Sequence, residues 1–130
     1  MALIRKKDID MKNVILALGI LFSLNTFAAE KCDIKKVTQE KVDQGKKAYE
    51  TNCVICHGAS GLGDGAAAAG LSPKPRNLVT GSFVKGSKTS EIYSTVTDGL
   101  SGTTMAAFGA SISDDDRCAI AQYITSIRKK

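Results

Sequence analysis

The chain has 130 residues, enough for one small domain, and a formal net charge of +5 at pH 7. It contains no Trp and only 5% aromatic residues, so by itself it buries little apolar volume. Its basic residues are scattered and are not interleaved with aromatics, which is unlike a nucleic-acid-binding surface. A modestly basic surface for acidic protein partners and ordinary solubilising charge are both compatible with this composition.

Residues 1–28 have the pattern of a secretory signal peptide. A basic start at Met11-Lys12 precedes an apolar run over 14–24, and small residues follow it. We place cleavage after Ala28, because small residues precede that bond. The apolar run is short for a bilayer span, so an uncleaved membrane anchor is the less favoured alternative.

The residues before Met11 include acids, which are unusual in a leader, so Met11 is a candidate for the true start. Removing residues 1–28 takes away four basic and two acidic residues, which lowers the net charge from +5 to +3. We expect the mature chain, residues 29–130, to be one soluble domain exported to the bacterial periplasm.

The first part of the mature chain predicts a helix from Thr38 to about Asn52. Val42, Gly45 and Tyr49 fall on one face of this helix. A glycine inside a helix is unfavourable unless another element packs closely there, so Gly45 indicates a close contact.

The segment Cys53-Val54-Ile55-Cys56-His57 follows directly and is the attachment signature of a c-type haem. Thiols at i and i+3 lie one helical turn apart and can both add to the haem vinyl groups. The adjacent imidazole then serves as an axial ligand of the iron. We therefore expect one haem c, bound covalently by Cys53 and Cys56, with His57, the only histidine of the chain, on the iron.

A thioredoxin-like dithiol and a zinc site are the alternatives for this motif. The first needs a preceding strand, whereas the sequence before Cys53 has a helical pattern. The second is disfavoured because His57 directly adjoins Cys56 and is poorly placed as a fourth ligand. The glycine-rich segment 58–65 lacks the flanking strand and Lys-Ser/Thr of a phosphate-binding loop.

Beyond the motif, short elements are separated by loops. A short helix is expected over 66–71, and the prolines Pro73 and Pro75 impose an extended stretch after it. A further helix is expected from Ser90 to about Thr97.

The last helix is expected to begin at Ser113, which has capping-box spacing with Asp116. The acidic residues of its first turn and the basic residues at its end both suit the helix dipole. Its apolar positions recur at helical spacing: Ile120, Tyr123, Ile124 and Ile127. The helical segments, without a convincing strand pattern, predict an all-α domain.

Met105 is the only methionine left after processing, since the other two lie in the leader region. It lies in the loop 102–108, 48 residues after His57. A thioether there can bind the open side of the haem iron as the second axial ligand. The alternative role of a lone methionine is to fill a gap in a core.

Together, these motifs resemble those of the small bacterial monohaem class I cytochromes c, over roughly residues 37–128. The resemblance rests on the haem motif, on the glycines within 61–65, on Pro75-Arg76-Asn77-Leu78 and on the Met105 loop. Ala106 departs from the family, in which proline commonly follows the methionine. The resemblance implies a cytochrome c fold, with three to four helices wrapped around one covalent haem and the N- and C-terminal helices crossing at right angles.

The resemblance also implies roles for single residues. Gly45, Tyr49 and Tyr123 match the positions at which the family's terminal helices cross. A prolyl carbonyl of the family accepts a hydrogen bond from the axial histidine, and Pro75 is our candidate, with Pro73 as the alternative.

Arg76 is a candidate to pair with a haem propionate, although an arginine in solvent explains it equally well. With both axial positions filled, we predict a one-electron carrier and not an enzyme, docking its redox partners transiently at the haem edge. The alternative is a haem enzyme or a diatomic-gas sensor in which Met105 is labile.

Cys32 and Cys118 are not needed by the haem. Cys118 lies two residues before Ile120, about 200° around the last helix from the apolar stripe, so we expect it on the outside of that helix. In an oxidising compartment an outward cysteine finds a partner, and we predict a Cys32–Cys118 disulfide. Two free thiols and intermolecular bonds are the alternatives.

Overall fold

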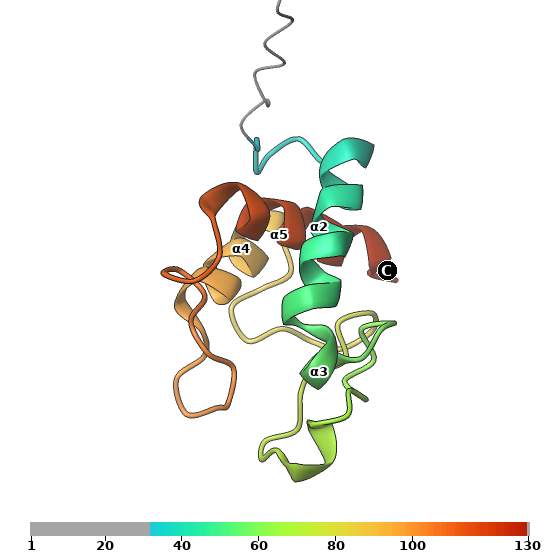
Figure 1. The fold of residues 1–130 in the computed structure, drawn as a ribbon, viewed down its shortest axis with the longest axis vertical. Helices are drawn as coiled ribbons and strands as arrows, with labels where there is room; N and C mark the ends of the chain where they lie inside the picture. The colour runs from blue at the N-terminus through green and yellow to red at the C-terminus, as the bar shows by residue number, and fades with distance from the viewer. Residues whose placement is uncertain (1–31, 130) are drawn as a thin grey trace, which may run out of the picture. The chain divides into compact units, whose positions relative to one another are not determined.

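The computed structural model describes residues 32–129, which contain four α-helices and one 3-10 helix joined by loops (Figure 1). In chain order they are α2 (Gln39–Asn52), α3 (Val54–His57), η1 (Ala68–Gly70), α4 (Thr89–Asp98) and α5 (Asp114–Ile127). This part of the chain has no strand, and none of its helices has the length and apolar character needed to cross a membrane. The leader expected over residues 1–28 and its cleavage site lie outside it.

The starts of the two long helices follow the sequence. Thr38 caps α2, where its side chain accepts a hydrogen bond from the backbone N–H of Lys41. Ser113 caps α5: its hydroxyl accepts from the N–H of Asp116 at 3.1 Å, so the predicted N-cap is confirmed, but it also donates to the Asp116 carboxylate at 2.8 Å, so that carboxylate bonds to the hydroxyl instead of closing a capping box on the backbone N–H of Ser113. The short helix expected over 66–71 is reduced to the single turn η1, because a residue before a proline, here Ser72, is pushed out of helical geometry.

Helices α2 and α5 cross at Gly45. A Cβ atom at this position would lie 2.0 Å from the carbonyl oxygen of Ala119, so only glycine allows the backbones to approach this closely. One turn further along α2, Tyr49 packs against Tyr123 with ring centroids 5.2 Å apart. The crossing of the first and last predicted helices is therefore confirmed.

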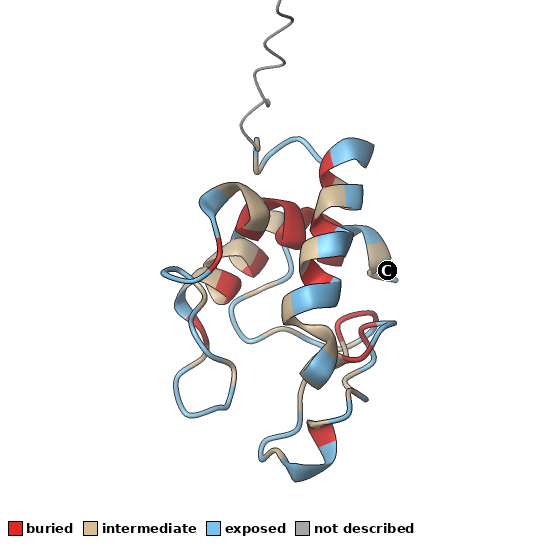
Figure 2. Ribbon diagram, viewed as in Figure 1, coloured by how far each residue is buried: buried red, intermediate tan, exposed pale blue. Residues whose placement is uncertain are grey.

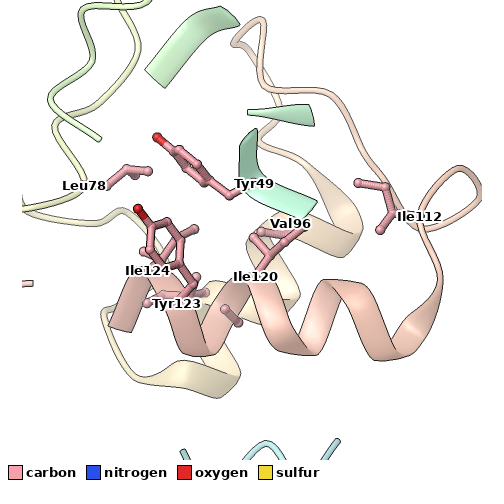
Figure 3. Packing of buried hydrophobic residues seen from close by; sticks show 9 residues of the cluster. Tyr49, Leu78, Val96, Ile112, Ile120, Tyr123 and Ile124 are labelled. Carbon is pink, nitrogen blue, oxygen red and sulfur yellow. The ribbon is translucent and has the colours of Figure 1, made fainter. Parts of the chain in front are cut away.

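The apolar core is built around this crossing. Tyr49 and Ile120 are fully buried, and Figure 3 shows them with Leu78, Val96 and Ile124 in one cluster. Figure 2 shows buried positions gathered on α5 and on the faces of α2 and α4 turned toward it. Through this core, α5 packs against both α2 and α4.

The predicted Cys32–Cys118 disulfide is present, with an S–S distance of 2.02 Å. The expectation that Cys118 lies on the outside of its helix is wrong, however, because its side chain is only 4% exposed. The start of the described chain lies over this face of α5 and covers it, so the two cysteines are joined beneath a segment and not at an open surface.

Gln122, one turn after Cys118, shows how this second face of α5 is buried. Its amide nitrogen donates to the carbonyl oxygens of Asp33, at 2.9 Å, and Lys36, at 3.1 Å. Its amide oxygen accepts from the N–H of Thr38 at 3.0 Å. A fully buried glutamine whose donors and acceptor are matched in this way pins the chain before α2 onto α5.

An ion pair joins the polar edges of the two crossing helices. Lys41, which is buried, lies 2.8 Å from the Asp115 carboxylate. Gln44 donates to the same carboxylate at 2.7 Å, and so does the backbone N–H of Cys32 at 2.9 Å. Burial opposes ionisation of Asp115, but these donors outweigh it and hold the pKa of its carboxyl below the usual range.

The helix crossing predicts an unequal response to two glycine substitutions. Gly45→Ala should lower the free energy of unfolding by about 1–3 kcal/mol, because the added methyl group must push the Ala119 backbone away. Gly70→Ala is the matched control, since nothing lies within 4 Å of the added Cβ. Denaturant unfolding of both variants checks this, and equal midpoints would contradict the close contact.

The Asp115 cluster predicts a pH-dependent contribution to stability. A lowered folded-state pKa means that the carboxylate stabilises the fold above its unfolded-state pKa of about 4, and that this contribution disappears as the pH falls through the folded-state value. Asp115→Asn should therefore reduce the free energy of unfolding at about pH 7, and the difference from wild type should shrink toward about pH 2. Asp43→Asn, on the exposed face of α2, is the control, and a difference that does not change with pH would argue against the prediction.

Candidate cofactor site

A cavity of about 340 Å³ lies between α3, the loops that follow it and the core helices. All six residues selected from the sequence as cofactor-binding or iron-binding line it: Cys53, Cys56, His57, Pro75, Arg76 and Met105. Apolar side chains from α4 and α5, among them Ile92, Val96 and Ile124, contribute to the remaining wall. The structure thus gathers at one cavity residues that are spread over more than 50 positions of the sequence.

The helix α3 carries the Cys-x-x-Cys-His motif as one tight turn. Cys53 ends α2, with its N–H bonded to the carbonyl of Tyr49 at 2.8 Å, and it also begins α3. The N–H groups of Cys56 and His57 both bond to the carbonyl of Cys53, at 3.2 and 2.9 Å. Both thiols are free and half-buried, and burial, together with the nearby Cys56 sulfur, raises the pKa of Cys53 to about 12.

The glycine-rich segment after the motif folds back onto α3. The N–H groups of Gly63, Gly65 and Ala67 bond to the carbonyls of His57, Cys56 and Ile55, at 2.8, 3.1 and 2.9 Å. These carbonyls end a helix and have no partner within it. The amides of this segment therefore complete α3, and the segment is not a phosphate-binding loop.

A Tyr49 hydroxyl bond connects this turn to the helix crossing. The hydroxyl donates to the carbonyl of Gly58 at 2.8 Å. Gly58 has a φ of +77°, in the left-handed region that favours glycine, which lets the chain reverse directly after the motif. Tyr49, which packs against Tyr123 in the core, therefore also fixes the direction in which the chain leaves His57.

The imidazole of His57 is oriented by a backbone carbonyl, but not by the predicted one. Its Nδ1 lies 3.1 Å from the carbonyl oxygen of Arg76, not of Pro75 or of Pro73. The Pro75 carbonyl faces Gly63, where an added Cβ would lie 2.4 Å from that oxygen, so it packs against the glycine-rich segment and the next carbonyl along meets the ring.

The Arg76 bond determines the tautomer of the imidazole. Because a carbonyl only accepts, Nδ1 carries the hydrogen and Nε2 keeps its lone pair. Burial lowers the pKa of His57, and the bond to Arg76 only partly opposes this. The ring is therefore held neutral, in the form in which Nε2 can coordinate a metal.

The side chain of Arg76 is engaged within its own loop. Its Nη1 donates to the carbonyl of Ser82. A guanidinium has five N–H donors, so this bond leaves others for a carboxylate at the cavity. The predicted propionate partner therefore lines the cavity and also closes the loop that bears the Arg76 carbonyl.

One backbone bond closes the Met105 loop on itself, and two more tie its end to α4. Met105 is half-buried and its carbonyl accepts from the N–H of Leu100 at 3.1 Å. The N–H groups of Phe108 and Gly109 bond to the carbonyls of Val96 and Thr97, each at 3.0 Å. These three backbone bonds keep Met105 in the wall of the cavity that His57 also lines.

The rival interpretations of the motif gain no support within residues 32–129. No strand precedes the motif there, as a thioredoxin-like dithiol requires. No three His, Cys, Asp or Glu side chains gather there to hold a metal ion, as a zinc site requires. The two remaining cysteines, Cys32 and Cys118, are joined to each other in the disulfide and so supply no further ligand.

Two arginines that reach the loops of this site were not recognised as such in the sequence. Arg117 and Arg128 both bond to backbone carbonyls of these loops. In the sequence, Arg128 is one of several basic residues at the end of the last helix, and Arg117 lies in no motif. Neither has a sequence signal for this role, because the carbonyls that they contact come close only in the folded chain.

Comparison with known proteins gives three similarities. A model of the family described as cytochrome C oxidase, cbb3-type, subunit III matches residues 40–124, which include the motif and Met105. The Azospirillum brasilense cbb3-type cytochrome c oxidase subunit CcoP is 29% identical over 85 residues, which cover 65% of this chain and 28% of that protein. A chain of the Kuenenia stuttgartiensis reducing HAO-like protein complex aligns with a TM-score of 0.67 and 32% identity, over 75% of this chain and 49% of that one. The chain thus spans less than a third of the first relative's length and about half of the second's.

Proposed function

Because the chain belongs to the cytochrome c family, as a cbb3-type oxidase subunit III domain with the cytochrome c fold, we propose that it is a periplasmic carrier of single electrons. It holds one covalent haem c with His57 and Met105 as axial ligands. The observation that carries the proposal is that the attachment cysteines, the only histidine and the methionine line a single cavity. Export of the chain rests on the leader expected over residues 1–28.

The residues present fit such a group. The two free thiols lie one turn apart on α3, and the apolar wall suits the face of a large planar ring. The haem, when bound, supplies one-electron exchange at its iron. The protein supplies the orientation, the exclusion of water and the axial ligands.

The His57 and Met105 side chains have complementary roles in this proposal. His57 presents Nε2 as a neutral imidazole, because its Nδ1 hydrogen bonds to the Arg76 carbonyl. The Met105 thioether, a soft ligand, raises the reduction potential. With both positions filled, no place is left for a substrate, which favours a carrier over the alternative of an enzyme or gas sensor.

The mouth of the cavity provides a docking surface for redox partners. Ile55 and Val84, which line it, are 58% and 69% exposed, the kind of apolar contact that a small, transient interface uses. The charged residues of the lining are basic, Lys74 and Arg76. We therefore propose that partners approach with an acidic surface, as components of a redox complex, like the assemblies to which the relatives belong.

Methionine ligation is tested by Met105→Ala. The variant should lose the weak red charge-transfer band of Met-ligated ferric haem, and its ferrous form should bind carbon monoxide readily. The reason is that no other methionine remains after processing to replace the thioether. Absorbance spectra of the holoprotein measure both effects.

The control for this variant is Leu100→Ala, which removes an apolar side chain from the same loop and cavity wall but no ligand atom. It should keep the red band. If the wild type itself lacks the band and binds carbon monoxide readily, the carrier function is contradicted and the labile-ligand alternative is favoured.

Covalent attachment is tested by replacing the two motif cysteines. In Cys53→Ser/Cys56→Ser, acidified organic solvent should extract all haem, because no thioether bond remains, whereas wild-type haem should stay with the protein. Cys32→Ser/Cys118→Ser is the matched control and should retain the haem, since this pair forms the disulfide. Haem that stays bound in the first variant would contradict the assignment.

A further inference from the structure

Two arginines, one near the start of α5 and one directly after its end, each bind a loop beside the cofactor cavity with their guanidinium groups. Arg117, near its start, is only 8% exposed. Arg128, which caps its end, is half-buried. Neither lines the cavity itself, so any influence on a cofactor must pass through the loops that they hold.

Arg117 holds the loop of Met105. Its Nη1 donates to the carbonyls of Gly109, at 2.7 Å, and Ile112. These two carbonyls belong to the segment that connects Met105 to α5. Its Nη2 bonds to the Asp114 carboxylate at 3.1 Å, which compensates the buried positive charge.

The same segment is also fastened to α4 by backbone bonds, from the N–H groups of Phe108 and Gly109 to the carbonyls of Val96 and Thr97. Arg117 therefore supplies the side-chain bonds that fix where the loop ends. Without the two carbonyl bonds, this segment would keep its backbone bonds to α4 but lose the side-chain bonds from α5. The bonds from Arg117 therefore add to the backbone bonds that place the thioether in the cavity wall.

Arg128 holds the opposite loop. Its Nη1 and Nη2 donate to the carbonyls of Leu78, at 3.1 Å, and Gly81, at 3.2 Å. Its guanidinium also lies over the ring of Phe83, 4.0 Å from the centroid. The planar fork of arginine is suited to two carbonyls at once, and a lysine would not reproduce both contacts.

The loop that Arg128 holds is the one that orients His57. It begins with Arg76, whose carbonyl accepts the bond from His57 Nδ1 and whose side chain closes onto Ser82. Ser82 directly follows Gly81, one of the two carbonyls that Arg128 binds. The contacts therefore run from Arg128 through this loop to the imidazole.

We propose that Arg117 and Arg128 are positioning residues that set the two axial sides of the cavity separately, Arg117 the Met105 side and Arg128 the His57 side. This inference rests on the proposed His57 and Met105 ligation. The two networks of contacts share the helix α5 but no loop residue, so a change in one side should leave the other intact.

The test uses Arg117→Lys and Arg128→Lys in the holoprotein. In Arg117→Lys, exogenous imidazole should bind the ferric form several-fold faster, because the Met105 loop opens more often. Exchange of the His57 Nδ1 hydrogen with solvent, followed by NMR in the ferrous form, should not change.

In Arg128→Lys the exchange of the His57 Nδ1 hydrogen should be several-fold faster. The midpoint potential should also rise, since a weaker bond to the Arg76 carbonyl leaves the imidazole a poorer electron donor to the iron. Imidazole binding should stay at the wild-type rate.

Two variants serve as controls. Asp115→Asn weakens the ion pair between α2 and α5 but touches neither loop, and it should retain wild-type imidazole binding. Lys129→Gln removes a charge next to Arg128 but keeps the backbone bond from Lys129 to Val79, and it should retain the wild-type exchange rate. If Arg117→Lys does not accumulate, Arg117→Gln keeps a donor without the buried charge and replaces it.

The outcomes separate this inference from the proposed function. Effects confined to each variant's own side support it. Variants that affect both sides alike in proportion to lost thermal stability, or that affect neither side, overturn it. A wild type without a Met105 signature overturns the proposed ligation and this inference with it, whereas an intact signature with unresponsive variants overturns this inference alone.

Discussion

The close crossing of α2 and α5 at Gly45 is the constraint on which the rest of the structure depends. With no side chain at this position, the α2 backbone reaches the carbonyl of Ala119, and Tyr49 is brought against Tyr123. The Tyr49 hydroxyl then binds the Gly58 carbonyl and fixes the reversal of the chain after the Cys-x-x-Cys-His turn. A single backbone contact between two helices thus reaches the candidate site through one aromatic side chain.

Helix α5 connects the elements that surround the cavity. One face carries the apolar stripe of the core, and a second face, at Cys118 and Gln122, is covered by the chain that precedes α2. Its arginines reach the two loops on either side of the cavity. A domain with few aromatic residues and little apolar volume therefore obtains order from polar bonds to backbone carbonyls, which are directional and specify one arrangement.

This arrangement suits a carrier of electrons. In the proposed carrier, His57 and Met105 would bind the iron from loops that are fastened to the core, so little would rearrange when its charge changes, and the apolar wall would keep water away from it. The exposed apolar residues of the cavity lining, Ile55 and Val84, would give redox partners a place to dock. The proposed function thus follows from rigidity around the site and exposure at its edge.

The sequence by itself determined the features that depend on spacing and on residue count. The cysteine spacing, the single histidine and the single methionine expected after processing pointed to the cofactor and its ligands, and helical periodicity, with a capping signal at Ser113, located α2, α4 and α5. Only the tertiary structure decided that Arg76 and not Pro75 supplies the carbonyl to His57, and that Cys118 is buried. The reason is physical: the direction of a carbonyl and the covering of a helix face depend on where remote segments pack, and no local pattern records this.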